Sequence, residues 1–146
     1  QLVSMCDLAV AAASASFALP GVNIGVFCST PAVGVARNVG RKRAMEMLLT
    51  GEMFSAAQAE SGGLINRSVP ADQLDATVNL YAERIASRSR SVIGLGKNTF
   101  YKQIDMGLDP AYEVAGGTMV CNVGLEDAAE GIDAFLQKRT PQWRDA

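Results

Sequence analysis

The sequence predicts an α/β region over residues 1–70, followed by an all-helical region over residues 71–146. Two patterns support this division. Short apolar runs bounded by small or turn-forming residues, which are typical of buried strands, fall before Pro70. After Pro70, apolar residues recur at spacings of three and four, which is the pattern of amphipathic helices. The predicted fold class is therefore α/β with a helical region after it.

Glycines, prolines and serines divide the α/β region into short elements. Ser29, Thr30 and Pro31 predict a helix start, because a hydroxyl can cap the helix and proline fits its first helical position. Gly40 and Gly51 are expected to end two successive helices. The elements expected in order are a helix end at 1–6, strands at 8–11 and 17–19, a loop at 20–25, helices at 31–39, 41–49 and 56–61, and a strand at 64–69.

The helices also carry predictions about which side chains face inward. In the helix at 41–49, we expect Met45, Leu48 and Leu49 to face the core. After Pro70, Asp72 is expected to cap a helix. The remaining expectations are a stripe of Leu74, Val78, Tyr81 and Ile85 on that helix, and further helices at 92–104, 110–123 and 125–139.

Composition limits the classes of function. The chain is 49% hydrophobic with a formal net charge of −2, so we expect no nucleic-acid partner, no membrane partner and some apolar surface covered by another protein. It has no histidine, and Cys6, Cys28 and Cys121 are far apart. We therefore expect neither a metal site nor a disulfide framework. This cysteine pattern fits a reducing compartment, either the cytoplasm or the mitochondrial matrix.

The stretch SFALPGVNIG, residues 16–25, places Gly21 at a corner between a strand and a loop. Such a corner often presents a catalytic side chain, and glycine has none. The run from Gly21 to Gly25 lacks the Lys-Ser/Thr ending of a phosphate-binding loop. Taken alone, the stretch therefore predicts a structural turn.

Three longer stretches, taken in order, carry a family resemblance. MCDLAVAAASASFALPGVNIG, AMEMLLTGEMFSAAQAESGGLINRSVP and EGIDAFLQKRTPQW together resemble the enoyl-CoA hydratase/isomerase family, the crotonases. GVFCSTPAVGVARNVGRKRAMEML is most similar to the enoyl-CoA hydratase domain-containing branch. The resemblance covers essentially the whole chain but only the second half of a family member. It implies the second half of a crotonase-like ββα spiral core over residues 1–70 and a helical trimerisation region over residues 71–146.

The resemblance also assigns catalytic positions. In hydratases of this family, two glutamates hold a water over the substrate double bond, and Gln1 and Gly21 stand at the matching positions. An amide neither takes nor gives a proton near neutral pH, and glycine offers only its backbone. Each general acid or base contributes ~10²- to 10⁴-fold in rate. We therefore expect hydratase activity to be weak or absent, and to rise if glutamate is restored at both positions.

By the same resemblance, the oxyanion hole and most of the CoA-binding surface precede Gln1. We therefore expect the 146 residues to be part of a longer protein, with a partner that supplies the missing half as the alternative.

The resemblance implies further contacts with an acyl-CoA. Phe135 and Lys138 match residues with which the family's last helix reaches CoA, in some members that of a neighbouring subunit. Judged from the residues alone, a core phenylalanine and a solvated lysine are an equal alternative. Residues 29–31, Ser29, Thr30 and Pro31, would line the acyl pocket. The expected ligand is a coenzyme A thioester, with no separate cofactor.

The predicted function is acyl-CoA handling of the fatty-acid type, with hydration in doubt and with self-association as a trimer or a dimer of trimers. Three alternatives stay open: a non-catalytic acyl-CoA binder or regulator, a crotonase with other chemistry such as thioester hydrolysis or isomerisation, and a helical assembly module without a ligand. Acyl-CoA binding separates the first two alternatives from the third. Turnover of a panel of acyl-CoA thioesters separates the second from the first.

Overall fold

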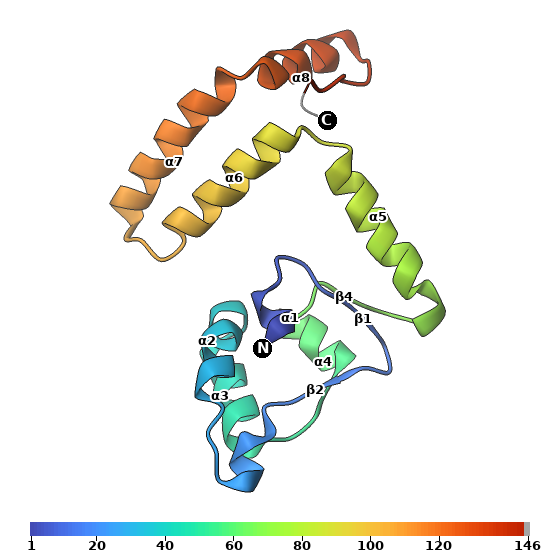
Figure 1. The fold of residues 1–146 in the computed structure, drawn as a ribbon, viewed down its shortest axis with the longest axis vertical. Helices are drawn as coiled ribbons and strands as arrows, with labels where there is room; N and C mark the ends of the chain where they lie inside the picture. Colours follow the sequence, from blue (N-terminus) through green and yellow to red (C-terminus); the bar gives the residue numbers. More distant parts are fainter. Residues whose placement is uncertain (145–146) are drawn as a thin grey trace. The chain divides into compact units, whose positions relative to one another are not determined.

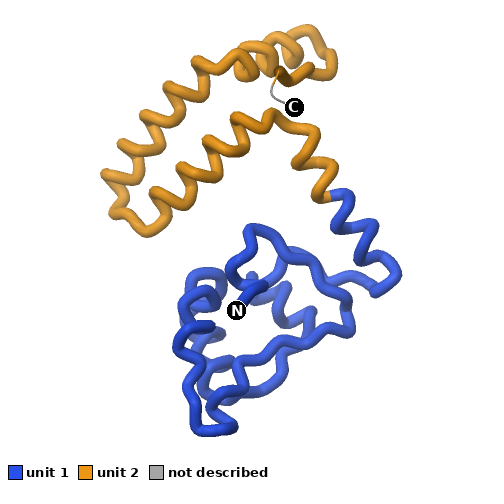
Figure 2. Tube along the Cα trace, viewed as in Figure 1, with its two compact units in different colours: residues 1–80 blue, residues 81–146 orange. Residues whose placement is uncertain are grey.

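The computed structural model describes residues 1–144 and divides the chain into two units. One unit spans residues 1–80 and the other residues 81–146 (Figure 2). Helix α5 (Leu74–Ala86) crosses the boundary between them. The sequence predicts a different division, into a core part at 1–70 and an oligomerisation region at 71–146. This division includes a statement about assembly, which a single chain does not test, so it stays a prediction.

The first unit contains two small sheets (Figure 1). Strand β1 (Val10–Ala12) pairs in parallel with β4 (Arg67–Val69). Strand β2 (Ser16–Phe17) pairs antiparallel with β3 (Phe54–Ser55). The strands predicted around residues 10, 17 and 67 are therefore present, but they are shorter than expected. The pairing of β3 with β2 was not predicted.

The helices of the first unit pack against the strands and against one another. Helix α4 packs against β2, β3 and β4, and α2 packs against both α1 and α3. The bounds of the helices in this unit are α1 (Leu2–Met5), the 3-10 helix η1 (Pro20–Ile24), α2 (Ser29–Asn38), α3 (Arg41–Thr50), α4 (Ala56–Ser61) and the 3-10 helix η2 (Ala71–Gln73).

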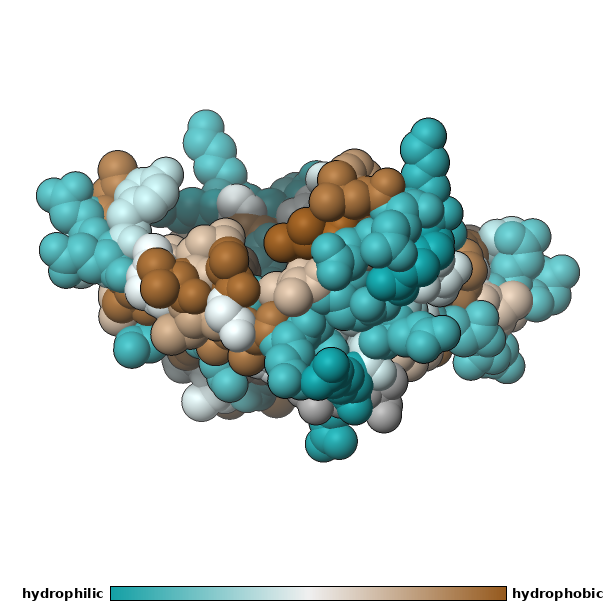
Figure 3. Space-filling view, turned by 90° about the horizontal axis from the view of Figure 1, so that it is seen from above, coloured by the Kyte–Doolittle hydropathy of each residue, from teal (hydrophilic) through white to brown (hydrophobic). Residues whose placement is uncertain are grey.

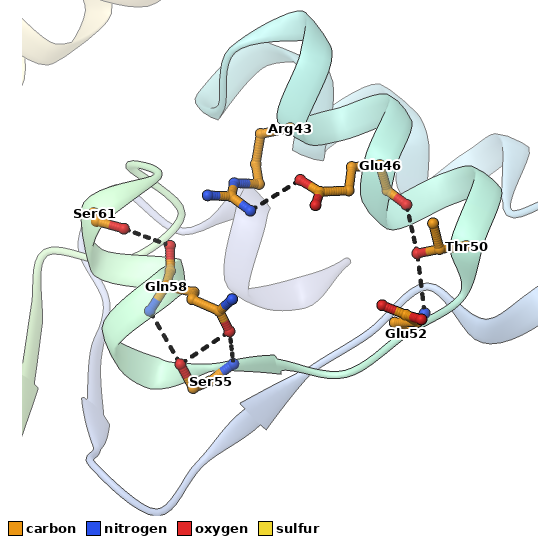
Figure 4. Close-up of polar contacts among 7 residues, drawn as sticks. All are labelled: Arg43, Glu46, Thr50, Glu52, Ser55, Gln58 and Ser61. Carbon is orange, nitrogen blue, oxygen red and sulfur yellow. Dashed lines mark hydrogen bonds and ion pairs between the residues drawn. The ribbon is translucent and has the colours of Figure 1, made fainter.

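Local capping sets the end of α3 and the start of α4. The Ser55 hydroxyl accepts a hydrogen bond from the backbone N–H of Gln58 at 3.2 Å, and the Gln58 side-chain oxygen accepts one from the Ser55 N–H at 2.9 Å (Figure 4). This reciprocal pair is a capping box, and it satisfies donors that the first helical turn leaves free. Gly51 ends α3 in the left-handed region, with φ of 62°, where a residue with a Cβ is disfavoured.

The core of the first unit corrects one prediction about α3. Ala44, Met47 and Leu48 are buried, whereas Met45 and Leu49 are 43% and 59% exposed. The buried residues follow spacings of three and four, so the inward face of α3 is rotated away from Met45 and Leu49. The other apolar residues of this core are Ala11, Leu19, Val35, Val39, Phe54, Ala56, Ala59, Leu64 and Ile65.

Two helix starts and one loop also differ from expectation. The segment expected to be a loop at 20–25 forms η1, because Pro20 fits its first turn and Gly25 ends it with φ of 76°. The N-cap of α2 is Cys28, and the Ser29 hydroxyl donates to the carbonyl of Phe27 at 3.4 Å instead of capping the helix. Asp72 lies inside η2 and does not cap α5.

The second unit consists of helices. After the end of α5, α6 (Arg90–Gln103) and α7 (Leu108–Val123) pack side by side and α8 (Glu126–Gln137) follows (Figure 1). The hydroxyl oxygens of Thr99 and Thr118 lie 3.0 Å apart and link α6 to α7. Among residues 81–144, only Ser89, Asp127 and Ala134 are buried. The apolar stripes of these helices are therefore left open to solvent in the single chain.

No helix within residues 1–144 is long and apolar enough to cross a membrane.

Candidate functional site

Gln1 lies directly before α1, as its N-cap residue. The residue is exposed, and its carbonyl oxygen accepts a hydrogen bond from the Ser4 hydroxyl at 2.7 Å. Gln1 lines a pocket of about 220 Å³. The residues of β2 and the strand end, Phe17, Ala18 and Leu19, line the same pocket. The structure therefore brings Gln1 and the segment that leads to the glycine corner to one place.

Close packing between α1 and α2 fixes the position of Gln1. A Cβ on Gly34 would lie 2.8 Å from the Met5 sulfur, so glycine allows the two helices to approach this closely. The side-chain amide of Asn38 donates to the carbonyls of both Ser4 and Gly34, at 2.7 and 2.8 Å. These bonds satisfy carbonyls at the junction of the two helices and hold α1 in place.

Gly21 lies in the turn between β2 and α2, and its backbone closes that turn. The carbonyl of Gly21 accepts a hydrogen bond from the N–H of Val26 at 2.9 Å. A Cβ on Gly21 would overlap the carbonyl oxygen of Val26, and it would lie 2.8 Å from the sulfur of Cys28. The direction in which a side chain would leave residue 21 is therefore occupied by backbone and by Cys28. Gly21 is not among the residues that line the pocket beside Gln1.

The predicted acyl-pocket residues lie at the first turn of α2. Ser29 and Thr30 are exposed and Pro31 is partly buried. These three residues do not line the pocket beside Gln1, whereas Val35, one turn further along α2, does. The contact of residues 29–31 with an acyl chain stays a prediction.

Phe135 and Lys138 lie in the second unit, at the end of α8. The Phe135 side chain is 81% exposed. It is therefore not a core phenylalanine in the single chain, and its exposure is compatible with contact to a ligand or to another protein. Lys138 follows the helix in the left-handed region, with φ of 53°, and its N–H donates to the Phe135 carbonyl at 3.2 Å. Their contact with CoA stays a prediction.

Sequence reasoning missed a set of acidic residues on α8. Glu130 receives two hydrogen bonds from the Arg139 guanidinium, at 2.6 and 2.9 Å, and one from the Gln142 N–H at 2.7 Å. The Arg139 side chain, followed by the Gln142 N–H, lowers the pKa of Glu130 to about 2. The signal was present in the sequence, because acidic residues lie in the first half of the last predicted helix, Arg139 ends that helix and Arg144 follows it.

Asp127 is the second acidic residue of this set, and it is almost fully buried. Its exposed fraction is 4%, and its Oδ1 accepts a hydrogen bond from the Arg144 N–H at 2.9 Å. That bond, together with the nearby Ser89 hydroxyl, lowers the pKa of Asp127. The carboxylate is therefore the charged form at neutral pH.

The described side chains supply amides, hydroxyls, carboxylates, thiols, ammonium and guanidinium groups, but no imidazole. Cys6, Cys28 and Cys121 are free thiols. Over residues 1–144, no three His, Cys, Asp or Glu side chains are grouped closely enough to hold a metal ion.

Comparisons with known proteins place this geometry in a family. The family model described as enoyl-CoA hydratase/isomerase matches residues 1–146. Enoyl-CoA hydratase domain-containing protein 3, mitochondrial, of Rattus norvegicus is 55% identical over 143 residues, which are 98% of this chain and 48% of that protein. The chain therefore spans about half the length of the curated relatives it matches.

Solved structures confirm the predicted crotonase-like fold. The crystal structure of human enoyl coenzyme A hydratase domain-containing protein 3 has a TM-score of 0.94 at 53% identity, covering 97% of this chain and 56% of that one. An enoyl-CoA hydratase from Mycobacterium smegmatis has a TM-score of 0.95 at 49% identity, covering 97% and 55%. The similarity to the domain-containing branch is confirmed as well. The chain belongs to the enoyl-CoA hydratase/isomerase family.

Proposed function

We propose that this chain is part of an acyl-CoA-handling protein in which the hydration step of the family is slow or absent. The substrate class follows from the family and from the pocket beside Gln1, whose walls include Phe17, Leu19 and Val35. Apolar walls with a few polar groups suit an acyl chain. An amide at Gln1 can hold a water or a carbonyl by hydrogen bonds, but it is not a general base.

The observation that carries this proposal is the closed turn at Gly21. The family resemblance assigns a glutamate to this position. In this chain the Val26 carbonyl and the Cys28 sulfur occupy the space that the first atom of such a side chain needs. Loss of one acid or base reduces a rate by ~10²- to 10⁴-fold, and both family glutamates are replaced here. These facts favour binding of acyl-CoA over its hydration.

Assembly and location are further parts of the proposal. The helices of the second unit expose large apolar side chains, including Tyr112, Val120 and Phe135. This exposure supports self-association of the kind expected for the family, as a trimer or a dimer of trimers. Relatives that are named mitochondrial, at 53–55% identity for the rat and human proteins, favour the mitochondrial alternative over the cytoplasmic one.

A panel of acyl-CoA thioesters tests the proposed function. The intact protein is mixed with each thioester, and binding and product formation are measured together, beside an ordinary enoyl-CoA hydratase as the positive control. We expect saturable binding of acyl-CoA with little or no hydration of the enoyl-CoA members. Absence of binding to every thioester would contradict the proposal, and so would hydration at a rate common for enzymes, on the order of 10 s⁻¹.

A further inference from the structure

The chain folds back along α8 after that helix ends, and acidic side chains of α8 hold the returning segment, residues 139–144. Glu130 accepts two hydrogen bonds from the Arg139 guanidinium, at 2.6 and 2.9 Å. Asp127 accepts one from the Arg144 N–H at 2.9 Å. These bonds join residues that are 9 and 17 positions apart in the sequence, so they fix the path of the chain as it leaves the helix.

Trp143 attaches the returning segment to a second place in the same unit. Its indole N–H donates to the Ser87 carbonyl at 2.8 Å, directly after the end of α5. Its ring lies against Gly131, where a Cβ would come within 3.4 Å of two ring atoms. The segment is therefore held both on α8 and at the turn before α6, which limits the freedom of the turn that leads into it.

The chain reverses at Lys138. This residue has φ of 53°, and every other described residue with a positive φ is a glycine. The left-handed region disfavours a residue with a side chain, so it persists where the surroundings enforce it. The next residue does so here, because the Arg139 N–H donates to the Ala134 carbonyl at 3.0 Å while its guanidinium binds Glu130.

The Glu130–Arg139 pair is suited to such a role. Its two side chains are 22% and 39% exposed, and two parallel hydrogen bonds join them. A guanidinium held by both oxygens of a partly shielded carboxylate is fixed in direction, unlike an ordinary surface ion pair. The pair therefore restrains the backbone on the side of Lys138 that follows the helix.

The two neighbouring basic side chains have different surroundings. Glu130 neutralises Arg139, whereas Lys138 is exposed and forms no ion pair within residues 1–144. A lysine thus occupies a position where glycine is less strained, and its charge is not used by the described part of the chain. A cation held in this way is available to an anion outside the chain.

The surroundings of Lys138 match two parts of a CoA thioester, its phosphates and its adenine ring. Phe135, one turn earlier, is 81% exposed and lines a groove together with Trp143. Figure 3 shows teal, hydrophilic side chains next to brown, apolar ones at the surface in the view that it draws. An aromatic side chain packs against a flat ring, and an ammonium pairs with a phosphate.

We propose that the Glu130–Arg139 pair positions Lys138, by holding it in the left-handed conformation from which its ammonium meets a phosphate of acyl-CoA. Glu130 and Arg139 are positioning residues, because they act through Lys138 and do not touch the ligand. This inference rests on the acyl-CoA binding of the proposed function, and it adds what aligns the cation.

Two variants that break the pair separate positioning from an effect of net charge. Arg139→Gln removes a positive charge, whereas Glu130→Gln removes a negative one and keeps an oxygen for the Gln142 N–H. Net charge alone changes the affinity for an anionic ligand in opposite directions in the two variants. Positioning weakens binding in both, and we expect each to raise the dissociation constant roughly tenfold, the effect of losing one charge-assisted hydrogen bond.

The measurement is calorimetric titration of the intact protein at low salt with butyryl-CoA, a saturated thioester that has no double bond to hydrate. Arg144→Gln is the matched control, because it removes a positive charge and the ion pair with Glu126 but keeps the backbone N–H that binds Asp127. We expect Arg144→Gln to change the dissociation constant by less than about twofold, and circular dichroism to be the same for all variants.

The Lys138→Ala background shows whether the pair acts through the lysine. We expect Arg139→Gln to weaken binding in the wild-type background and to cause no further loss in Lys138→Ala. An equal loss in both backgrounds, or opposite effects of Arg139→Gln and Glu130→Gln, would overturn the inference. Wild-type affinity in both of these variants would also overturn it while leaving the proposed function intact. Absence of butyryl-CoA binding by the wild type would contradict the proposed function and overturn the inference with it.

Discussion

The carbonyl oxygen of Val26 occupies the position that a Cβ atom on Gly21 would need. The two residues are also joined by the hydrogen bond from the Val26 N–H to the Gly21 carbonyl. Residue 21 is therefore more than a position where an acid is absent, because the turn around it is built on a glycine. A glutamate there requires the segment from Gly21 to Cys28 to move.

This relationship predicts that side chains at position 21 destabilise the protein. Gly21→Ala forces its Cβ against backbone, so we expect a loss of about 1–3 kcal/mol in the free energy of unfolding. Gly94→Ala is a matched control, because a Cβ on Gly94 meets no atom within 4 Å, and we expect it to be neutral or slightly stabilising. Chemical denaturation of the intact protein measures both. A Gly21→Ala variant as stable as Gly94→Ala would show that the turn relaxes freely.

The same relationship changes what is expected from restoring the glutamates. The sequence suggested that glutamate at both positions would raise the hydration rate. Gln1 is exposed, so we expect Gln1→Glu to change the free energy of unfolding by no more than about 0.5 kcal/mol. Gly21→Glu does not fit the turn, so the double variant is expected to hydrate crotonyl-CoA no faster than Gln1→Glu alone. Steady-state assays compare the two, and a rise of ~10²-fold or more in the double variant would contradict this expectation.

The lowered pKa of Glu130 predicts how the stability of the second unit depends on pH. Its pKa falls from 4.5 to about 2 in the folded chain, so its charged form stabilises the fold. The stabilisation is complete above pH 4.5 and is lost as the pH falls from there towards 2. Trp143, the only tryptophan, donates to the Ser87 carbonyl at 2.8 Å, and its fluorescence reports on this segment. We expect Glu130→Gln to flatten the acid transition, and an unchanged transition in that variant would exclude Glu130 as its cause.

Lys138 offers a test in which stability and binding move in opposite directions. Its φ of 53° is unfavourable for lysine and favourable for glycine. We expect Lys138→Gly to stabilise the protein by up to about 1 kcal/mol. If the ammonium meets a CoA phosphate, Lys138→Ala and Lys138→Gly both weaken CoA binding by about 1–2 kcal/mol, and less so at high salt. Equal affinities of wild type and both variants at low salt would remove Lys138 from the CoA site.

Local signals made much of the fold predictable. Ser55 with Gln58, and Gly51, act within one helical turn, so the ends of α3 and α4 could be inferred from neighbouring residues. The strands could not be bounded in this way. Strands of two or three residues, such as β2 and β4, are defined by partners far away in the sequence.

The site shows the same limit. The family resemblance located Gln1 and Gly21, but no pattern in the sequence indicates that Val26 folds back over Gly21. The predicted inward face of α3 was wrong for a related reason. Met45 and Leu49 are apolar, so the sequence pattern includes them in the core, but in the structure both are exposed. Asp127 could not be identified as buried, because an acidic residue in the first turn of a helix is normally solvated.

Calorimetric titration of the intact protein with crotonyl-CoA distinguishes binding of the thioester from its hydration. One trace reports both events, because binding gives heat that saturates, whereas hydration gives heat that continues for as long as substrate remains. We expect heat that saturates with binding, and any sustained heat to correspond to a turnover far below ~10 s⁻¹. Sustained heat that corresponds to turnover at that rate or above, or a trace without any binding heat, would contradict this expectation.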